Sequence, residues 1–150
     1  MYQVTENNLA LSQISHVVCS HGHIDHVGNL NLFPQATILL DSDIGLTSVY
    51  SMHDYSKIPF QINEHVEVIS TPGHTSQDLS LVVKSAYSGS MDYLGTVVVA
   101  GDIFESESDN NIWQQSSWNV EQQQKSREYI LSVADHIVPG HGKMFAVKNT

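Results

Sequence analysis

The sequence predicts an α/β fold, and three observations lead to this expectation. Apolar, β-branched runs of strand length alternate with segments whose apolar residues recur at helical spacing. Several of the strand-like runs end in a loop that begins with His or Asp, which is how α/β enzymes assemble a site from separate strand ends. The 150 residues suit one domain, residues 1–150, and leave little room for two independent domains.

The first third of the chain predicts two helices and two strands in alternation. Leu9, Leu11 and Ile14 give a short amphipathic helix, and Pro34 ends the second helix. A mixed segment then suggests a turn or a short helix. The expected helices cover residues 5–14 and 26–33, and the expected strands cover residues 16–20 and 36–40. The mixed segment covers residues 41–54.

The rest of the chain predicts four strands and one long helix. Asn119, with Gln122 three positions later, forms a plausible capping box for that helix, whose inward residues would be Ile130, Leu131 and Ala134. The acidic residues 105–111 are expected to form an exposed, solvated loop. The strands cover residues 64–70, 79–84, 95–100 and 137–138, the second and third forming a hairpin, and the helix covers residues 119–134.

Composition indicates a globular protein and limits its partners. The formal net charge is -10, with only six Lys and Arg, so broad electrostatic attraction to a nucleic-acid backbone is not expected. Cys19 is the single cysteine, which excludes an intrachain disulfide and fits a buried residue in a reducing compartment. No apolar run is long enough to span a membrane, and no signal peptide is apparent, so the expected location is the cytoplasm, with the nucleus as a second location.

The segment Ser20–His26 carries three imidazoles and one carboxylate. In an extended segment alternate side chains share a face, so His21, His23 and Asp25 can converge on one point, and His26 can reach a second point. Imidazole nitrogens and carboxylate oxygens suit zinc, iron or manganese, and the lack of cysteine disfavours a closed structural zinc site. The segment therefore predicts an open, catalytic metal site.

Three later residues extend this candidate site. His74, Asp102 and His141 each follow a strand-like run, and glycine or proline beside them allows the backbone to turn sharply. The other histidines are interpreted as structural or exposed; they are His16, His53, His65 and His136. Trp113 and Trp118 are expected to pack in the core or in a lid, with stacking on a substrate as the alternative.

The run His21-Gly22-His23-Ile24-Asp25-His26 resembles the H-x-H-x-D-H signature of the metallo-β-lactamase superfamily. His74, Asp102 and His141 match the later ligand motifs in order, and the resemblance extends from about Ile14 to Val147. It implies a four-layer αββα sandwich with a dimetal site at one edge of two sheets. By this resemblance His21, His23 and His74 hold one metal, Asp25, His26 and His141 hold the other, and Asp102 bridges them.

The resemblance also implies a chemistry and a substrate. Two Zn²⁺ sharing a hydroxide would form a hydrolase, with Asp25 orienting the hydroxide in addition to binding metal. The flanking residues, such as Thr71-Pro72-Gly73-His74 and Val138-Pro139-Gly140-His141-Gly142, resemble one branch of the superfamily, which implies an endoribonuclease processing histone pre-mRNA 3' ends. The acidic charge, and the short span between Asp102 and His141, argue against RNA.

Three alternatives remain open. The first is a glyoxalase II-like or lactamase-like hydrolase of a small-molecule ester, thioester or amide. The second is a persulfide-oxidising enzyme with one Fe²⁺ held by His21, His74 and Asp102, and two Mn²⁺ are an alternative to zinc. The third is a catalytically silent binding or regulatory fragment.

The resemblance further predicts that the first sheet is incomplete. Members of the superfamily place a run of strands ahead of the H-x-H-x-D-H segment, whereas that segment begins here at residue 21. The expectation is an N-terminally truncated domain with an exposed sheet edge, which a partner chain or a homodimer would complete.

Overall fold

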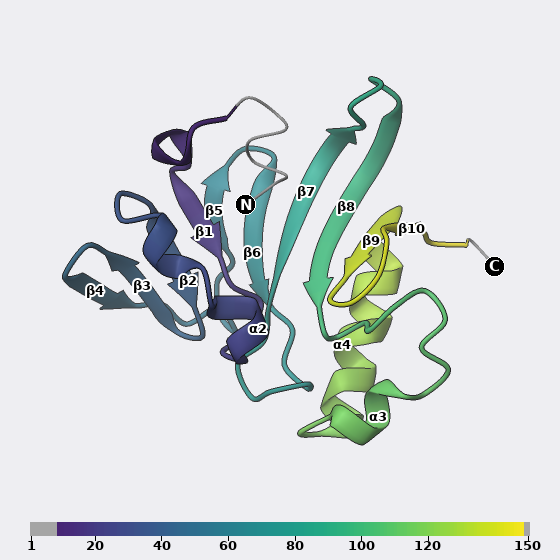
Figure 1. Cartoon of the computed structure of the whole chain (residues 1–150). Helices are drawn as coiled ribbons and strands as arrows, with labels where there is room; N and C mark the ends of the chain where they lie inside the picture. Colours follow the sequence, from purple (N-terminus) through teal and green to yellow (C-terminus); the bar gives the residue numbers. More distant parts are fainter. Residues whose placement is uncertain (1–8, 149–150) are drawn as a thin grey trace.

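A computed structural model describes residues 9–148, which form two β-sheets that face each other, with helices on the outer sides (Figure 1). In the first sheet, β1 and β2 are parallel and the remaining neighbours are antiparallel. Its strand order is β1 (His16–Val18), β2 (Thr37–Leu40), β3 (Asp43–Leu46) and β4 (Val49–Met52). Within residues 9–148, β1 pairs with β2 alone.

The second sheet is larger and mainly antiparallel. The β7–β8 hairpin forms its centre, and β8 pairs in parallel with β9 after a crossover through helix α4 (Val120–Val133). Its order is β10 (Phe145–Ala146), β9 (His136–Pro139), β8 (Tyr93–Gly101), β7 (Leu79–Tyr87), β6 (Val66–Ser70) and β5 (Phe60–Asn63).

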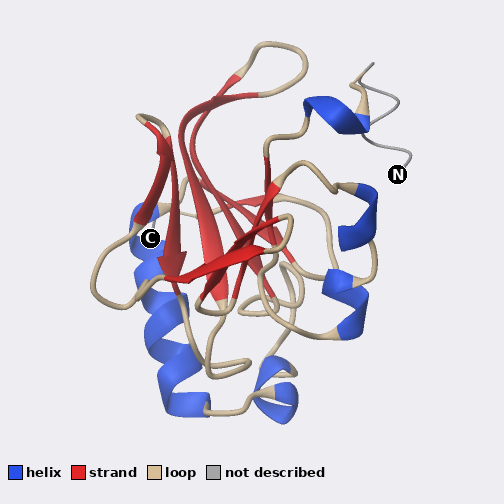
Figure 2. Cartoon of the chain, turned by 90° about the vertical axis from the view of Figure 1, so that its left-hand side faces the viewer, coloured by secondary structure: helices blue, strands red, loops and turns tan. Residues whose placement is uncertain are grey.

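Two apolar clusters hold the layers together. Between the sheets, Leu39 of the first sheet packs with Val68 and Leu79 of the second. On the other face of the second sheet, α4 contributes Ile130 to a cluster that includes Val98. Burial of a large aliphatic side chain contributes about 1.5–3 kcal/mol, so these clusters fix the positions of the strand ends. Figure 2 shows α4 on one side of the sheets and the short helical segments η1 (Leu11–Gln13), α2 (Ile24–Val27) and η2 (Leu30–Leu32) on the other.

Most predicted elements are present, and the α/β fold class is confirmed. The predicted strands correspond to β1, β2, β6, β7, β8 and β9, and the Asn119 side chain caps α4 by accepting a hydrogen bond of 3.0 Å from the Gln122 backbone N–H. Cys19 is buried, as expected. No described helix is both long enough and apolar enough to cross a membrane.

The expectation of a turn or short helix over residues 41–54 is wrong, because this segment forms β3 and β4. Tight turns precede β3 and β4, and they contain Asp41 (φ 54°) and Thr47 (φ 56°) respectively. Positive φ in a hairpin turn is usually supplied by glycine or asparagine, so the sequence lacked the expected turn signal. Strand β5 was also missed.

The two predicted N-terminal helices are shorter than expected. Residues 5–8 of the first lie outside the described part, and the remainder forms only the 3-10 turn η1 (Leu11–Gln13). The second divides into α2 (Ile24–Val27) and the 3-10 turn η2 (Leu30–Leu32), separated by Gly28 and Asn29. Leu131 of α4 is 44% exposed, in contrast to its predicted inward position.

The loop over residues 105–111 is less solvated than predicted. Asp109 is only 7% exposed, and its carboxylate accepts two hydrogen bonds from the Arg127 guanidinium, at 2.8 and 3.2 Å. A short helix, α3 (Trp113–Ser116), follows this loop, and Trp113 is buried. Arg127 lies over the rings of both Phe104 and Trp113, which ties the loop to α4.

Candidate metal centre

All seven residues of the predicted site lie at one edge of the two sheets. The turn after β1 carries His21 and His23 and leads into α2, which carries Asp25 and His26 in its single turn. The other three follow β6, β8 and β9, and they are His74, Asp102 and His141. Strands distant in sequence thus end side by side (Figure 1).

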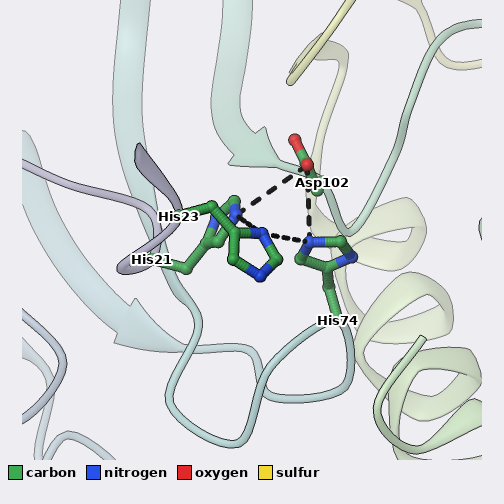
Figure 3. A group of neighbouring side chains, drawn as sticks. All are labelled: His21, His23, His74 and Asp102. Atoms are coloured by element: carbon green, nitrogen blue, oxygen red, sulfur yellow. Dashed lines mark hydrogen bonds and ion pairs between the residues drawn. The ribbon is translucent and has the colours of Figure 1, made fainter. Parts of the chain in front are cut away.

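The first group of side chains consists of His21, His23, His74 and Asp102, one ligand atom of each lying within 4.8 Å of all the others. His23 Nδ1 is 2.8 Å from His21 Nε2 and 3.1 Å from His74 Nε2. Asp102 Oδ2 is 3.4 Å from His74 Nε2 and 3.8 Å from His21 Nε2. Figure 3 shows the three rings and the carboxylate turned toward one another.

The second group consists of Asp25, His26 and His141. Asp25 Oδ2 is 3.7 Å from Nε2 of both His26 and His141. Asp102 lies between the two groups, because its Oδ1 is 3.2 Å from His26 Nε2 and its Oδ2 is 3.3 Å from His141 Nε2. One carboxylate therefore faces both groups, which is the arrangement that a bridging ligand requires.

The spacing of these atoms fits metal ligands. Two ligand atoms at about 2.1 Å from a tetrahedral ion lie about 3.4 Å apart, and the four distances given above for the first group lie between 2.8 and 3.8 Å. Asp102 Oδ1 is buried and has no hydrogen-bond partner among the described residues, although His26 Nε2 is only 3.2 Å away. Asp102 Oδ1 and His26 Nε2 can lie this close without a hydrogen bond if the lone pairs of both atoms point at a shared third position, such as a metal site, and not at each other.

The protonation states also suit metal binding. Burial, followed by the charge of His26, lowers the pKa of His21 to about 4. Burial likewise lowers the pKa of His74. A hydrogen bond from its own backbone N–H is the largest factor that lowers the pKa of the exposed Asp25. At neutral pH, His21 and His74 are therefore neutral imidazoles and Asp25 is an anion, the forms that bind metal ions.

Asp78, which sequence reasoning did not identify, holds the loop that carries His74. Its side chain is 2% exposed. Asp78 Oδ2 accepts hydrogen bonds from the backbone N–H groups of Gly73 (3.0 Å) and Thr75 (2.7 Å), and Oδ1 accepts one from Thr75 Oγ1 (2.8 Å). Burial raises the pKa of Asp78 to about 6, and these hydrogen bonds oppose the increase.

Helix α4 connects the His74 loop to the Asp102 segment. Gln123 is fully buried, and its Nε2 donates to the backbone oxygens of Asp102 (3.0 Å) and Ile103 (3.4 Å). Ser126 Oγ donates to the backbone oxygen of Pro72 (2.7 Å). Gly73 packs so closely on the Gln123 backbone that any side chain at Gly73 would overlap it. One helix therefore positions two of the loops that carry the site.

Glu105 is a further carboxylate near the site. One of its oxygens lies within 4.8 Å of ligand atoms of both Asp102 and His141. Its position three residues after Asp102 was available in the sequence, but the acidic run that it begins suggested a solvated loop. Burial of Gln123, by contrast, has no local sequence signal, because glutamine in a helix is usually exposed.

The other histidines lie away from this centre. His53 Nε2 is 2.7 Å from the Ile58 backbone oxygen, and its ring packs on Tyr55 and Phe60. His136 Nδ1 is 2.9 Å from the backbone oxygen of Leu94. The other contacts are with neighbouring side chains, His16 with Ser15 and His65 with Glu64. These positions agree with the structural or exposed interpretation.

Comparison with known proteins supports the same fold family. The model of the metallo-beta-lactamase superfamily matches residues 3–40. Metallo-beta-lactamase domain-containing protein 1 of Xenopus laevis is 45% identical over 98% of this chain and 62% of its own length. The protein of the same name in Homo sapiens is 43% identical over 93% of this chain and 51% of its own length. The chain thus spans only about half to three fifths of these relatives.

Solved structures show the same fold at low identity. AidC, a dizinc quorum-quenching lactonase, superposes with a TM-score of 0.67 at 14% identity, covering 99% of this chain and 65% of its own. AiiA of B. thuringiensis superposes with a TM-score of 0.62 at 16% identity, covering 93% of this chain and 60% of its own. The family match over residues 3–40 and the 45% identity make the chain similar to the metallo-beta-lactamase superfamily, and the superpositions show that it shares the fold.

Proposed function

We propose that the chain acts as a metal-dependent hydrolase with a dinuclear centre. The observation that carries this proposal is the convergence of seven candidate ligands at one sheet edge, in two groups that share Asp102. His21, His23 and His74 would hold one ion, and Asp25, His26 and His141 would hold the other. Members of this superfamily are hydrolases, which agrees with the proposal.

The side chains have distinct roles in this scheme. Divalent ions bound at the two positions would supply a Lewis acid and lower the pKa of a coordinated water. Asp102 would bind at both positions, because its buried carboxylate lies among the imidazoles of both groups. Asp25 is 57% exposed, so its second oxygen can accept a proton from the attacking water and orient it toward a substrate approaching from solvent.

Metal content tests the dinuclear centre directly. We propose two Zn²⁺ per chain, because a set of five imidazoles with two aspartates suits zinc. Elemental analysis of the purified chain should give two zinc ions. One iron per chain would contradict the dinuclear scheme in favour of a mononuclear iron centre, and two manganese ions would keep the scheme with another metal.

For the substrate, we propose RNA, with cleavage of histone pre-mRNA at its 3' end in the cytoplasm or nucleus. Support comes from the motif resemblance and from the 45% identity to metallo-beta-lactamase domain-containing protein 1. The zinc-loaded chain should cut such an RNA, and Asp25→Asn should reduce the rate by about 100-fold or more, as loss of a general base does. Asp92→Asn, an equal charge change in the distant β7–β8 turn, should leave the rate unchanged. Intact RNA at saturating enzyme would refute this substrate.

A small-molecule ester or thioester is the second candidate substrate, and two observations favour it. Four of the six Lys and Arg side chains form ion pairs with Asp or Glu, so few positive charges remain to attract a phosphate backbone. A cavity of about 480 Å³ beside the His74 loop lies within the size range of small-molecule sites. It is lined by Ser76 and Gln77 of that loop and by Asp41 and Tyr55, but by none of the seven candidate ligands. Hydrolysis of a panel of thioesters and lactones by the same zinc-loaded sample, with no RNA cleavage, would establish this alternative.

A further inference from the structure

Glu105 lies in the third group of candidate ligands, with Asp102 and His141. The resemblance to the metallo-β-lactamase superfamily assigns Asp102 and His141 to the metals and gives Glu105 no role as a ligand. The carboxylate is half-buried beside the site. The other acidic residue of this loop before Asp109 is Glu107, which does not join a candidate group within the described residues.

Both the backbone and the side chain of Glu105 are held in place. The Glu105 backbone oxygen accepts a hydrogen bond of 3.1 Å from the His141 backbone N–H, which joins the two loops directly. Ser116 Oγ, at the end of α3, donates to Glu105 Oε1 at 2.9 Å. One carboxylate oxygen is thereby anchored.

The position of that carboxylate is within reach of a metal ion at the Asp25–His26–His141 position. Two ligands on one ion at about 2.1 Å are at most about 4.2 Å apart, and a Glu105 oxygen lies within 4.8 Å of the ligand atoms of both Asp102 and His141. Rotation about the terminal, softly restrained torsion of Glu105 covers the difference.

We propose that Glu105 is an additional metal-binding carboxylate, which supplies an oxygen ligand to the ion held by Asp25, His26 and His141. This inference rests on the proposed dinuclear function. The added oxygen makes the second position harder than the first, which carries three imidazoles and Asp102, so the two positions should differ in their relative affinity for Mn²⁺ and Zn²⁺.

Metal titration of the purified chain tests this assignment without any activity assay. Zn²⁺ and Mn²⁺ are titrated separately against a chromophoric chelator, with wild type and Glu105→Gln compared. The variant keeps the shape of the side chain and removes its charge. We expect the weaker of the two equivalents to bind about 10–100-fold less tightly in the variant, with a larger factor for Mn²⁺ than for Zn²⁺, and the tighter equivalent to be unchanged.

Two further variants separate direct binding from general electrostatics and from misfolding. Glu107→Gln makes the same charge change on an exposed residue of the same loop, and both equivalents should bind as in wild type. Ser116→Ala removes the anchor of Glu105 Oε1 without touching the ligands, and it should weaken the same equivalent by a smaller factor. Equal weakening by Glu105→Gln and Glu107→Gln would overturn the proposal.

The test also distinguishes this inference from the function on which it rests. A wild-type chain that binds two ions, with a Glu105→Gln titration identical to it, would overturn the role of Glu105 alone. A wild-type chain that binds no divalent ion would overturn the dinuclear function, and the role of Glu105 with it.

Discussion

Gly140 offers the sharpest test of how the fold holds Asp102. It follows β9, and its backbone N–H donates to the backbone oxygens of Gly101 (3.0 Å) and Phe104 (2.9 Å), so the turn before His141 is locked against the Asp102 segment. A Cβ atom at residue 140 would overlap Asp102 Oδ1 and would lie 3.0 Å from Asp102 Cγ and 3.2 Å from Asp102 N. The substitution Gly140→Ala therefore places a methyl group where the shared carboxylate lies.

The size of the effect follows from this geometry. Carbon and oxygen atoms in contact need roughly 3.5 Å, so the carboxylate must move by about 1 Å or more. Metal–ligand distances tolerate only about 0.2 Å, so Asp102 would be lost from both metal positions. Loss of an outer-sphere partner of a metal ligand typically lowers metal affinity by about 10–100-fold. Loss of Asp102 itself should lower zinc affinity by more than about 100-fold, which corresponds to more than about 2.7 kcal/mol. Overpacking should cost about 1–3 kcal/mol of stability in the metal-free chain.

Zinc affinity by chelator competition, and urea unfolding of the metal-free chain, measure the two effects separately. Gly142→Ala is the matched control in the same loop, because its Cβ would meet the nearest atoms of Pro139 and Ser106 at 3.2 Å, a tight but tolerable distance. It should lower zinc affinity by less than about threefold, a free-energy change well under 1 kcal/mol. Zinc binding by Gly140→Ala within threefold of wild type would refute the steric reasoning.

Three other perturbations probe the surroundings of the site. Arg127→Met leaves the buried Asp109 carboxylate unpaired and should destabilise the chain by about 3–5 kcal/mol in urea unfolding. Adding Asp109→Asn to this variant should recover part of the lost stability, and no recovery would show that the broken ion pair is not the cause. Gln123→Met removes the donor to the Asp102 backbone oxygen and should cost about 1–3 kcal/mol together with a measurable loss of zinc affinity, and unaltered affinity would exclude a positioning role. Burial raises the pKa of Tyr55 from 10.0 to about 12, so Tyr55 keeps its proton to a higher pH in the folded state than in the unfolded state. The ionisation of Tyr55 therefore lowers the stability of the chain as the pH rises from 10 to 12. Tyr55→Phe should therefore lose about 1.4 kcal/mol less than wild type between pH 8 and pH 11, and parallel unfolding curves would contradict this.

The accuracy of the sequence predictions depended on how local their signals were. Strands with long β-branched runs, such as β7 and β8, were predicted because many of their apolar side chains are buried on one central sheet, which leaves a strong local pattern in the sequence. Strands β3 and β4 were missed because their turns use Asp41 and Thr47 at positive φ, where the surrounding sheet compensates for a conformation that these residues do not prefer. The helix predicted after the His cluster was too long, because Gly28 and Asn29 separate α2 from the 3-10 turn η2.

The sequence alone predicts the seven candidate ligands, their order and the superfamily that they resemble. It does so because imidazoles and carboxylates at a characteristic spacing can be recognised as metal ligands from residue type and position. Only the tertiary structure decided which atoms approach each other, that Asp102 faces both groups, and that Glu105 joins them. It also assigned Asp78, Gln123 and Arg127 to the support of the site, since burial and long-range hydrogen bonds depend on which distant segments pack together. These contacts have no fixed sequence spacing, and for that reason the folded chain was needed to find them.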